Sequence, residues 1–205
     1  MPRSKSSQGW LTTHHQDQYV LQARHDGYRS RAVYKLQQLQ RKDRILKPGQ
    51  QVLDLGAAPG GWCEYISQCN GHQGRIIAVD LLPIAPIAGV DFIKGDFTEQ
   101  TTLDQLLHLL EAKTLDLVLS DMAPNLSGIE SVDQPKSVYL VELAFELASN
   151  CLDSNGIFVT KLFQGKGFDT LVSGFQRRFK SVKLRKPDAS RSASAEIYAV
   201  CRSLK

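Results

Sequence analysis

The chain has 205 residues, of which 42% are hydrophobic and 22% are charged, and its formal net charge is +4. This composition is ordinary for a globular protein, and the length suits one domain with a sizeable core. The sequence has neither an apolar run of about 18 residues nor the apolar segment of a signal peptide. We therefore expect residues 1–205 to form a single cytoplasmic domain without a membrane span.

Basic residues gather at both ends of the chain, whereas acidic residues dominate its middle. Residues 1–50 hold 10 Lys and Arg against 3 acids, residues 51–160 hold 4 against 15, and residues 161–205 hold 11 against 3. Two basic segments would attract a polyanion, and an acidic middle would suit a cationic small molecule. Ordinary solvated surface charge is the alternative explanation.

The first 48 residues are expected to hold a tail and two helices. Residues 1–13 combine serines with cations and show no apolar pattern, which is typical of a mobile basic tail. A short helix is expected over residues 16–23, and Ser30 is a suitable N-cap for a second helix that ends near residue 43. In this second helix Lys35 lies beside an apolar stripe, a position that also suits a surface lysine with a buried stem.

A glycine-rich turn follows the first predicted strand, residues 52–55. Gly56, Gly60 and Gly61 stand between this strand and a helix predicted over residues 62–68. Without side chains there, a ligand can approach the unpaired N–H groups at the start of the helix. The spacing is not the G-x-G-x-x-G of pyrophosphate-binding turns. A turn with a purely structural purpose is the alternative.

Three acids stand at the carboxyl ends of the next three predicted strands: Asp80 closes residues 75–80, Asp96 follows residues 91–94, and Asp121 follows residues 115–120. Ligands of open α/β sheets bind outside the carboxyl ends of the strands. An acid about 20 residues beyond the glycines, such as Asp80, is suited to accept hydrogen bonds from ribose hydroxyls. The pattern therefore predicts a nucleoside ligand without a diphosphate.

The second half of the chain continues the alternation of helices and strands. Helices are predicted over residues 103–110, 134–152 and 167–178, and strands over residues 156–163, 182–185 and 196–201. Lys161 falls within the apolar strand at 156–163, where a lysine is unusual unless the strand is an edge strand. The cysteines and histidines show no zinc-binding spacing, so we expect reduced structural cysteines and no metal, with Mg²⁺ on the acids as the alternative.

Several segments together resemble the FtsJ/RrmJ family of S-adenosylmethionine-dependent RNA ribose 2′-O-methyltransferases. The likeness runs from about residue 24 to residue 201 and is carried by SRAVYKL at 30–36, DLGAAPGGW at 54–62, SDMAPN at 120–125, Lys161, and residues 186–198. The resemblance implies an α/β, Rossmann-like fold. Its seven-stranded sheet would be mostly parallel with one antiparallel strand, and helices would cover both faces. The alternating order of the predicted elements agrees with that fold.

The resemblance also implies roles for individual residues. A catalytic Lys-Asp-Lys-Glu tetrad would consist of Lys35, Asp121, Lys161 and Glu196. The cofactor, S-adenosyl-L-methionine, would contact Gly60, Trp62, Asp80, Asp96 and Asp121, with Asp80 on the ribose and Asp96 near the adenine amine. Residues 14–48 would form a helical RNA-binding extension. Candidate phosphate contacts are Arg24, Arg29, Arg31, Lys35, Lys186 and Arg191.

Lys161 is the candidate general base, because its apolar strand and a second cation at Lys35 favour the neutral amine. Asp121 and Glu196 favour the charged form, so Lys161 could instead orient the hydroxyl or stabilise the charge that develops on its oxygen. The expected substrate is a uridine of 23S rRNA in the large ribosomal subunit, bound by a monomer that does not bind DNA. A tRNA, an mRNA cap, a non-catalytic ribosome-assembly role and a nicotinamide-dependent dehydrogenase are the alternatives.

Overall fold

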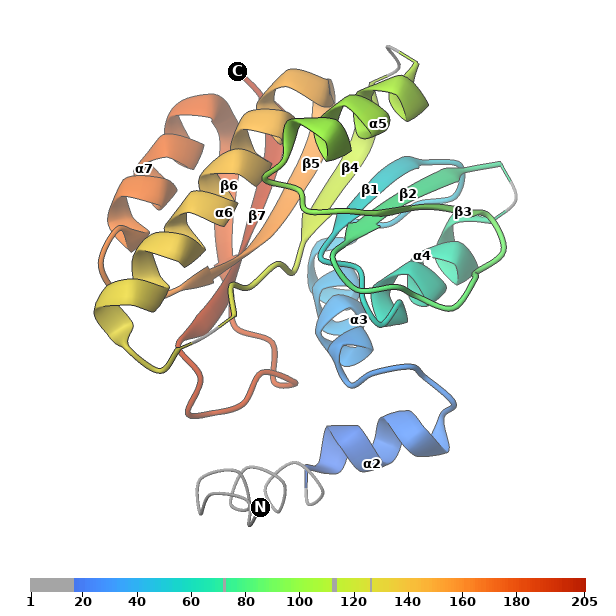
Figure 1. Ribbon diagram of the computed structural model, residues 1–205, viewed down its shortest axis with the longest axis horizontal. Coiled ribbons are helices and arrows are strands. Elements are labelled where there is room, and N and C mark those ends of the chain that lie inside the picture. The colour runs from blue at the N-terminus through green and yellow to red at the C-terminus, as the bar shows by residue number, and fades with distance from the viewer. Residues whose placement is uncertain (1–16, 72, 112–113, 126) are drawn as a thin grey trace.

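A seven-stranded sheet forms the centre of the computed structural model, which describes residues 17–71, 73–111, 114–125 and 127–205 (Figure 1). The strands are β1 (Gln51–Leu55), β2 (Arg75–Asp80), β3 (Val90–Lys94), β4 (Leu115–Ser120), β5 (Leu152–Phe163), β6 (Phe179–Arg185) and β7 (Glu196–Leu204). The helices are α2 (Gln18–His25), α3 (Ala32–Asp43), α4 (Gly61–Asn70), α5 (Gln100–Leu110), α6 (Glu130–Cys151) and α7 (Phe168–Arg178).

The strand order is β3-β2-β1-β4-β5-β7-β6, and every neighbouring pair is parallel except the two pairs that include β7. The predicted Rossmann-like fold with one antiparallel strand is therefore confirmed. The order in which successive strands are placed across the sheet reverses between β1 and β4, although these two strands are parallel. In such sheets this reversal opens a crevice at the carboxyl ends of the strands, where ligands bind.

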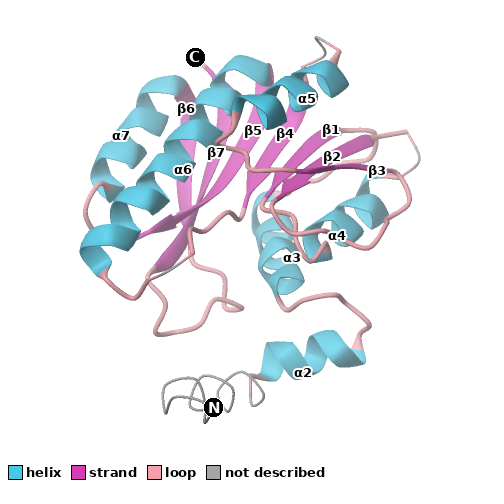
Figure 2. Ribbon diagram, in the orientation of Figure 1, coloured by secondary structure: helices cyan, strands magenta, loops and turns pink. Residues whose placement is uncertain are grey.

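Helices cover both faces of the sheet because its strands are apolar on both sides. Leu53 and Leu55 of β1 share one core cluster with residues of α5, α6 and α7, whereas Val52 shares the other with residues of α3 and α4. Figure 2 shows the same division, with α5, α6 and α7 on one side of the strands and α3 and α4 on the other. Successive strand residues point to opposite faces, which explains the alternation.

Helix α2 lies beyond the end of α3, away from the sheet (Figure 1). It packs through aromatic side chains, with the rings of Tyr19 and Tyr34 5.5 Å apart, and the Tyr34 hydroxyl donates to Asp26 at 2.7 Å. The predicted cap at Ser30 is wrong, because α3 begins at Ala32 without a side-chain cap. The predicted basic tail, residues 1–13, lies outside the described residues.

Most boundaries differ from the prediction by a few residues, and the starts of α6 and β5 differ for identifiable local reasons. Helix α6 begins at Glu130 rather than near residue 134, although Pro135 lies inside it and a helix interior disfavours proline. Strand β5 begins at Leu152, and its polar residues 153–155 carry no apolar alternation that would have indicated a strand. Within the described part of the chain, no helix has both the length and the apolar character needed to cross a membrane.

Candidate active site

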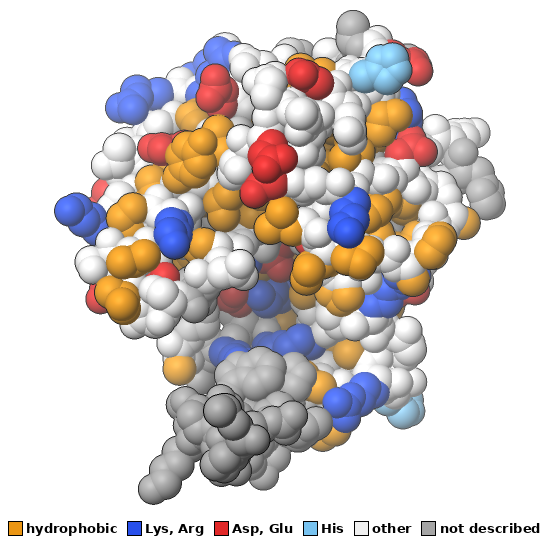
Figure 3. Space-filling model, in the orientation of Figure 1, with side chains coloured by type: hydrophobic (Ala, Val, Ile, Leu, Met, Phe, Trp, Pro, Cys, Tyr) orange, Lys and Arg blue, Asp and Glu red, His pale blue; other side chains and the backbone are white. Residues whose placement is uncertain are grey.

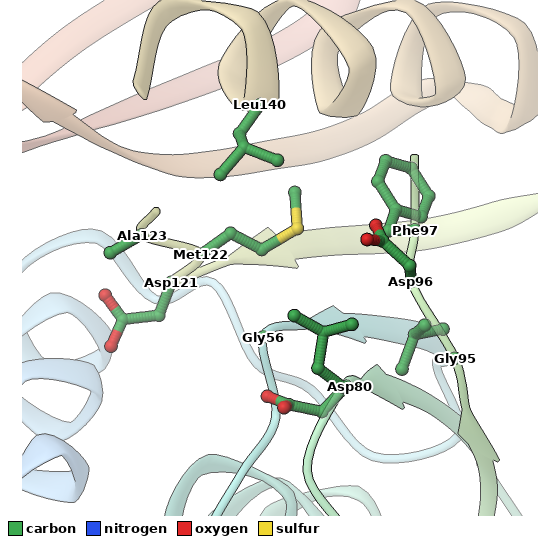
Figure 4. A pocket seen from close by; sticks show the side chains of 11 residues that line it. Gly56, Asp80, Gly95, Asp96, Phe97, Asp121, Met122, Ala123 and Leu140 are labelled. Carbon is green, nitrogen blue, oxygen red and sulfur yellow. The ribbon is translucent and has the colours of Figure 1, made fainter. Parts of the chain in front are cut away.

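A pocket of about 150 Å³ opens at the carboxyl ends of the central strands, where the strand order reverses (Figure 4). Its lining combines three carboxylate residues with small and apolar ones: Gly56, Val79, Asp80, Leu81, Gly95, Asp96, Phe97, Asp121, Met122, Ala123 and Leu140. The acids at the carboxyl ends of β2, β3 and β4 therefore meet at one site. Leu140 reaches it from α6, and nothing in the sequence distinguishes this leucine from the other apolar residues of that helix.

Gly56 allows the ends of β1 and β4 to approach each other at the pocket. Its φ is +80°, and a Cβ at this position would lie 2.9 Å from the backbone nitrogen of Met122. Any side chain would therefore strain the backbone and separate the two strand ends. The glycine keeps the floor of the pocket open to a ligand.

The carboxylates of Asp80 and Asp96 are fixed by neighbouring backbone N–H groups. Asp80 accepts hydrogen bonds from the N–H of Ala58 and that of Leu82, both at 2.8 Å. Asp96 accepts from the N–H and the hydroxyl of Thr98, at 2.8 and 2.7 Å. A carboxylate has about four acceptor positions, so both remain able to accept hydrogen bonds from a ligand in a fixed direction.

Gly60 and Trp62, which the resemblance also assigned to the cofactor, do not line this pocket. A Cβ on Gly60 would meet Arg29 and Ile87 at 3.1 to 3.3 Å, so this glycine is needed for local packing. The Trp62 indole is buried, and its Nε1 donates to the carbonyl of Ala32 at 2.7 Å. These two residues could therefore contact a cofactor in this pocket through their backbone only.

The four residues of the predicted tetrad converge beside the pocket as two ion pairs. Lys161 Nζ lies 3.0 Å from Asp121 Oδ1 and donates to the Asp121 carbonyl at 2.6 Å. Lys35 Nζ lies 2.8 Å from Glu196 Oε1. Neither lysine is a surface or edge residue, since Lys161 belongs to the inner strand β5 and both side chains are about nine-tenths buried.

Tyr198 joins the two ion pairs, a link that the sequence analysis missed. Its hydroxyl donates to Asp121 Oδ1 at 2.7 Å and accepts from Lys35 Nζ at 3.3 Å. Burial and the carboxylates of Asp121 and Glu196 raise the pKa of Tyr198 well above its ordinary value, so the phenol keeps its proton. Its position two residues after Glu196, on the same strand face, was the available signal.

Asp121 stays ionised at the centre of this network. Burial alone would raise its pKa, but Lys161, Lys35 and the Tyr198 hydroxyl hold the pKa of Asp121 below its ordinary value. In Figure 4 its carboxylate points away from Asp80 and Asp96. Asp121 therefore serves as a wall of the pocket while its charge is directed to the lysines.

A second, larger hollow of about 510 Å³ lies on the other side of this wall. Its lining includes two arginines, three residues of the tetrad, one phenylalanine and several small side chains. The lining residues are Arg31, Ala32, Lys35, Ala123, Lys161, Phe163, Arg191, Ala193, Ser194 and Glu196. Ala123 lines both hollows, so they adjoin. Figure 3 shows Lys and Arg side chains gathered in a hollowed part of this face.

The cations proposed as phosphate contacts divide into two groups. Arg31, Lys35 and Arg191 line the larger hollow, and Arg24 is exposed on α2. Lys35 pairs there with Glu196, and the two arginines pair with Asp17. Arg29 instead donates to the carbonyls of Ala85 and Pro86, and Lys186 donates to the carbonyls of Ser194 and Glu196. Arg29 and Lys186 therefore hold neighbouring loops in place and do not line either hollow.

Asp54, at the end of β1, is fully buried and lies outside both hollows. Burial raises the pKa of Asp54 to about 7, against a hydrogen bond from the Cys63 thiol at 3.0 Å that lowers it. Its Oδ1 has no hydrogen-bond partner. A carboxyl group in this state titrates near neutral pH, which makes Asp54 a source of pH-dependent stability.

No cluster of His, Cys, Asp and Glu in the described ranges could hold a metal ion.

Comparison with known proteins identifies the family to which this chain belongs. The model of the FtsJ-like methyltransferase family matches residues 28–204. The chain belongs to this family. The FtsJ-like chain is 54% identical over 205 residues to "Ribosomal RNA large subunit methyltransferase E" of Hahella chejuensis, with 100% of both chains covered. The match excludes the nicotinamide-dependent dehydrogenase as the explanation of this fold.

Solved structures extend the comparison to three dimensions. A ribosomal RNA methyltransferase, described as putative, from Plasmodium falciparum superposes on the FtsJ-like chain with a TM-score of 0.76 and 29% identity, covering 86% of this chain and 98% of that one. Aeropyrum pernix fibrillarin, solved with natively bound S-adenosyl-L-methionine, shares the fold at a TM-score of 0.56 and 15% identity, covering 85% and 75%. The expected methyltransferase fold is therefore confirmed.

Proposed function

We propose that this FtsJ-like methyltransferase transfers a methyl group from S-adenosyl-L-methionine to a ribose 2′-hydroxyl of RNA, with a uridine of 23S rRNA in the large ribosomal subunit as the target. The observation that carries the proposal is the convergence of Lys35, Asp121, Lys161 and Glu196 between an acidic pocket and a cationic hollow. The names of the relatives and the basic ends of the chain support an RNA substrate.

The residues of the smaller pocket fit the cofactor. The carboxylates of Asp80 and Asp96, fixed by backbone N–H groups, are suited to accept hydrogen bonds from ribose hydroxyls and an adenine amine. Gly56 leaves the floor of the pocket free of a side chain, and Leu140 and Met122 supply apolar surface. S-adenosyl-L-methionine, when bound, supplies a methyl group activated by a positively charged sulfur.

Lys161 orients the hydroxyl that receives the methyl group. Its ion pair with Asp121 uses the ammonium form, which has no lone pair to accept a proton. Two of its N–H bonds are directed to the carboxylate and the carbonyl of Asp121, and a third remains for the ribose oxygen. In this arrangement Lys161 stabilises the negative charge that the ribose oxygen gains as its proton leaves to solvent in the adjoining hollow. The general-base role requires the ion pair to lose its proton first.

Lys35, Glu196 and Tyr198 hold the other side of the reacting group. The ion pair between Lys35 and Glu196 ties α3 to the start of β7. The Tyr198 hydroxyl connects this ion pair to Asp121, because it accepts a hydrogen bond from Lys35 and donates one to Asp121. Fixed partners of this kind align donor and acceptor before the reaction, which can lower a barrier by roughly 7–11 kcal/mol at best. The cationic hollow then positions the RNA by its phosphates.

The decisive experiment measures whether the enzyme transfers a labelled methyl group to ribosomal subunits or to isolated RNA. Large ribosomal subunits, protein-free rRNA and tRNA from cells that lack the protein would each be incubated with the enzyme and labelled S-adenosyl-L-methionine. We expect label in the large-subunit RNA, on a ribose 2′-oxygen of one uridine, mapped by resistance to alkaline cleavage. Label on a base, or on tRNA only, would contradict the proposal.

Two Lys161 variants separate the proposed role from that of a general base. Lys161→Arg keeps a cation with N–H donors but cannot act as a base at neutral pH. We expect this variant to retain more activity than Lys161→Met, which has neither charge nor donors. Equal loss in the two variants, together with a rate that rises with pH in the native enzyme, would favour the general base.

A further inference from the structure

A third hollow, of about 200 Å³ and also lined by cations, lies beside the hollow of about 510 Å³. We call this third hollow the flank groove. It is lined by Gln38, Leu39, Arg41, Lys42, Arg185, Lys186, Pro187 and Asp188. Two segments contribute to both hollows. The first half of α3 and residues 191–196 line the large hollow, and the second half of α3 and residues 185–188 line the flank groove.

A ridge separates the two hollows where the loop between β6 and β7 is fastened to α3. The N–H of Ala189 donates to Gln38 Oε1 at 3.1 Å, and the Arg31 guanidinium donates to the Ala189 carbonyl. Lys35 on one side of the ridge and Lys42 on the other are seven residues apart, which corresponds to about 10 Å along a helix. One bound molecule can therefore occupy both hollows.

Two of the four cations of the flank groove are fixed in place. Arg185 forms two hydrogen bonds to Asp43, both at 2.7 Å, and the Asp43 side chain is only 2% exposed. Lys186 is fixed by its bonds to backbone carbonyls. Arg41 and Lys42, by contrast, are exposed at the mouth of the groove. Among the residues that line the groove, Asp188 is the one acid, so positive charge prevails.

We propose that the flank groove binds the phosphates of RNA that flanks the target nucleotide, outside the hollow in which methyl transfer takes place. The inference rests on the proposed RNA substrate. The groove has no aromatic residue on which a base could stack, whereas arginine and lysine at its mouth suit phosphate oxygens. Such contacts increase affinity and fix the register of the RNA without reading its sequence.

RNA is favoured over an acidic protein because the groove continues the substrate hollow. Both are lined by α3 and the segment that follows β6, and on the other side of the ridge Arg31 and Arg191 share the single carboxylate of Asp17, which leaves positive charge in excess. A backbone that enters the large hollow meets cations on both sides of the ridge. A protein partner would need no such continuity.

The test is the double variant Arg41→Ala/Lys42→Ala, with Arg177→Ala/Lys180→Ala as its control. The control removes the same two charges from exposed positions at the opposite end of β6. Binding would be measured over a range of salt concentrations, with large ribosomal subunits and with protein-free rRNA. We expect the groove variant to bind both RNAs about tenfold more weakly and to reduce the salt slope by about 1.5, at roughly 0.7 to 0.9 per phosphate contact.

Turnover at saturating RNA and affinity for S-adenosyl-L-methionine should stay unchanged in the groove variant. A groove variant that binds like the native enzyme, or a control that weakens binding equally, would overturn the inference. A loss with ribosomal subunits but not with protein-free rRNA would assign the groove to a ribosomal protein and overturn it as well. If the native enzyme neither bound nor methylated rRNA, the proposed function itself would fail.

Discussion

The two adjoining hollows of the candidate active site differ in the charge of the residues that line them. In the smaller pocket Asp80 and Asp96 are carboxylates held by backbone N–H groups, with no cation among the lining residues. In the larger hollow the cations predominate, and Lys35 and Lys161 are each paired with a carboxylate. A small cationic donor and a polyanionic acceptor are thereby attracted to different sides of one wall.

Asp121 is the element that the two sides share. Its backbone borders the smaller pocket, and its carboxylate pairs with Lys161 on the other side. In the proposed function the donor and the acceptor therefore bind on separate sides, and Asp121 is in contact with both. Variants on either side should therefore affect one ligand and leave the other unchanged.

The largest effect is expected from the acceptor side. Lys161→Ala should lower kcat by roughly 10²- to 10³-fold, because it removes a donor aimed at the developing oxyanion. Affinity for S-adenosyl-L-methionine, measured by calorimetry, should remain that of the native enzyme. Lys166→Ala, at an exposed lysine on the following loop, is the control. Weak cofactor binding with normal turnover of the bound fraction would contradict the separation.

A smaller effect is expected from the donor side. Asp80→Ala should weaken cofactor binding by roughly 10- to 100-fold, because a hydrogen bond to a charged group contributes about 1.5–3 kcal/mol. RNA affinity, measured by filter binding without cofactor, should not change. If RNA affinity fell in parallel, the two hollows would not be independent.

Tyr198→Phe tests the link between the two ion pairs. The change removes the hydroxyl that donates to Asp121 and accepts from Lys35 but keeps the buried ring. We expect kcat to fall about tenfold, corresponding to the roughly 1–3 kcal/mol cost of a buried acceptor left without its donor. The KM values for RNA and cofactor should stay near those of the native enzyme. An unchanged kcat would show that the ion pairs act independently.

The smallest effect on activity is expected at Asp54, which belongs to neither hollow. The pKa of Asp54 is raised to about 7, so between about pH 4 and pH 7 the folded protein holds a proton that the unfolded chain has lost. The contribution of Asp54 to stability should therefore fall as pH rises through this window, by roughly 1.4 kcal/mol per pH unit. Asp54→Asn cannot lose this proton and should flatten the dependence.

Denaturant unfolding between pH 4.5 and 8 measures this contribution. The difference in unfolding free energy between Asp54→Asn and the native protein should shift in favour of the variant as pH rises. Asp104→Asn, on the exposed side of α5, controls for the loss of one carboxyl group. A difference that stays constant with pH would show that Asp54 does not titrate in this window.

Much of the fold was predictable because local patterns specify it. Apolar or alternating segments marked all seven strands, and the acids at the carboxyl ends of β2, β3 and β4 marked the ligand-binding edge of the sheet. The boundaries failed where a local signal was absent or misleading, as at Pro135 inside α6 and at the polar start of β5. Ser30 is a favourable cap by type, yet its hydroxyl makes no hydrogen bond in the folded chain.

The sequence by itself determined the order of the elements, the residue types of the site and the family, because these follow from periodicity, turn chemistry and motif spacing. Only the tertiary structure decided which residues meet. Lys35 and Glu196 are 161 positions apart and pair because α3 packs against β7. Trp62 turns into the core, and Tyr198 joins two ion pairs. Contacts between distant segments depend on packing, which no local pattern contains.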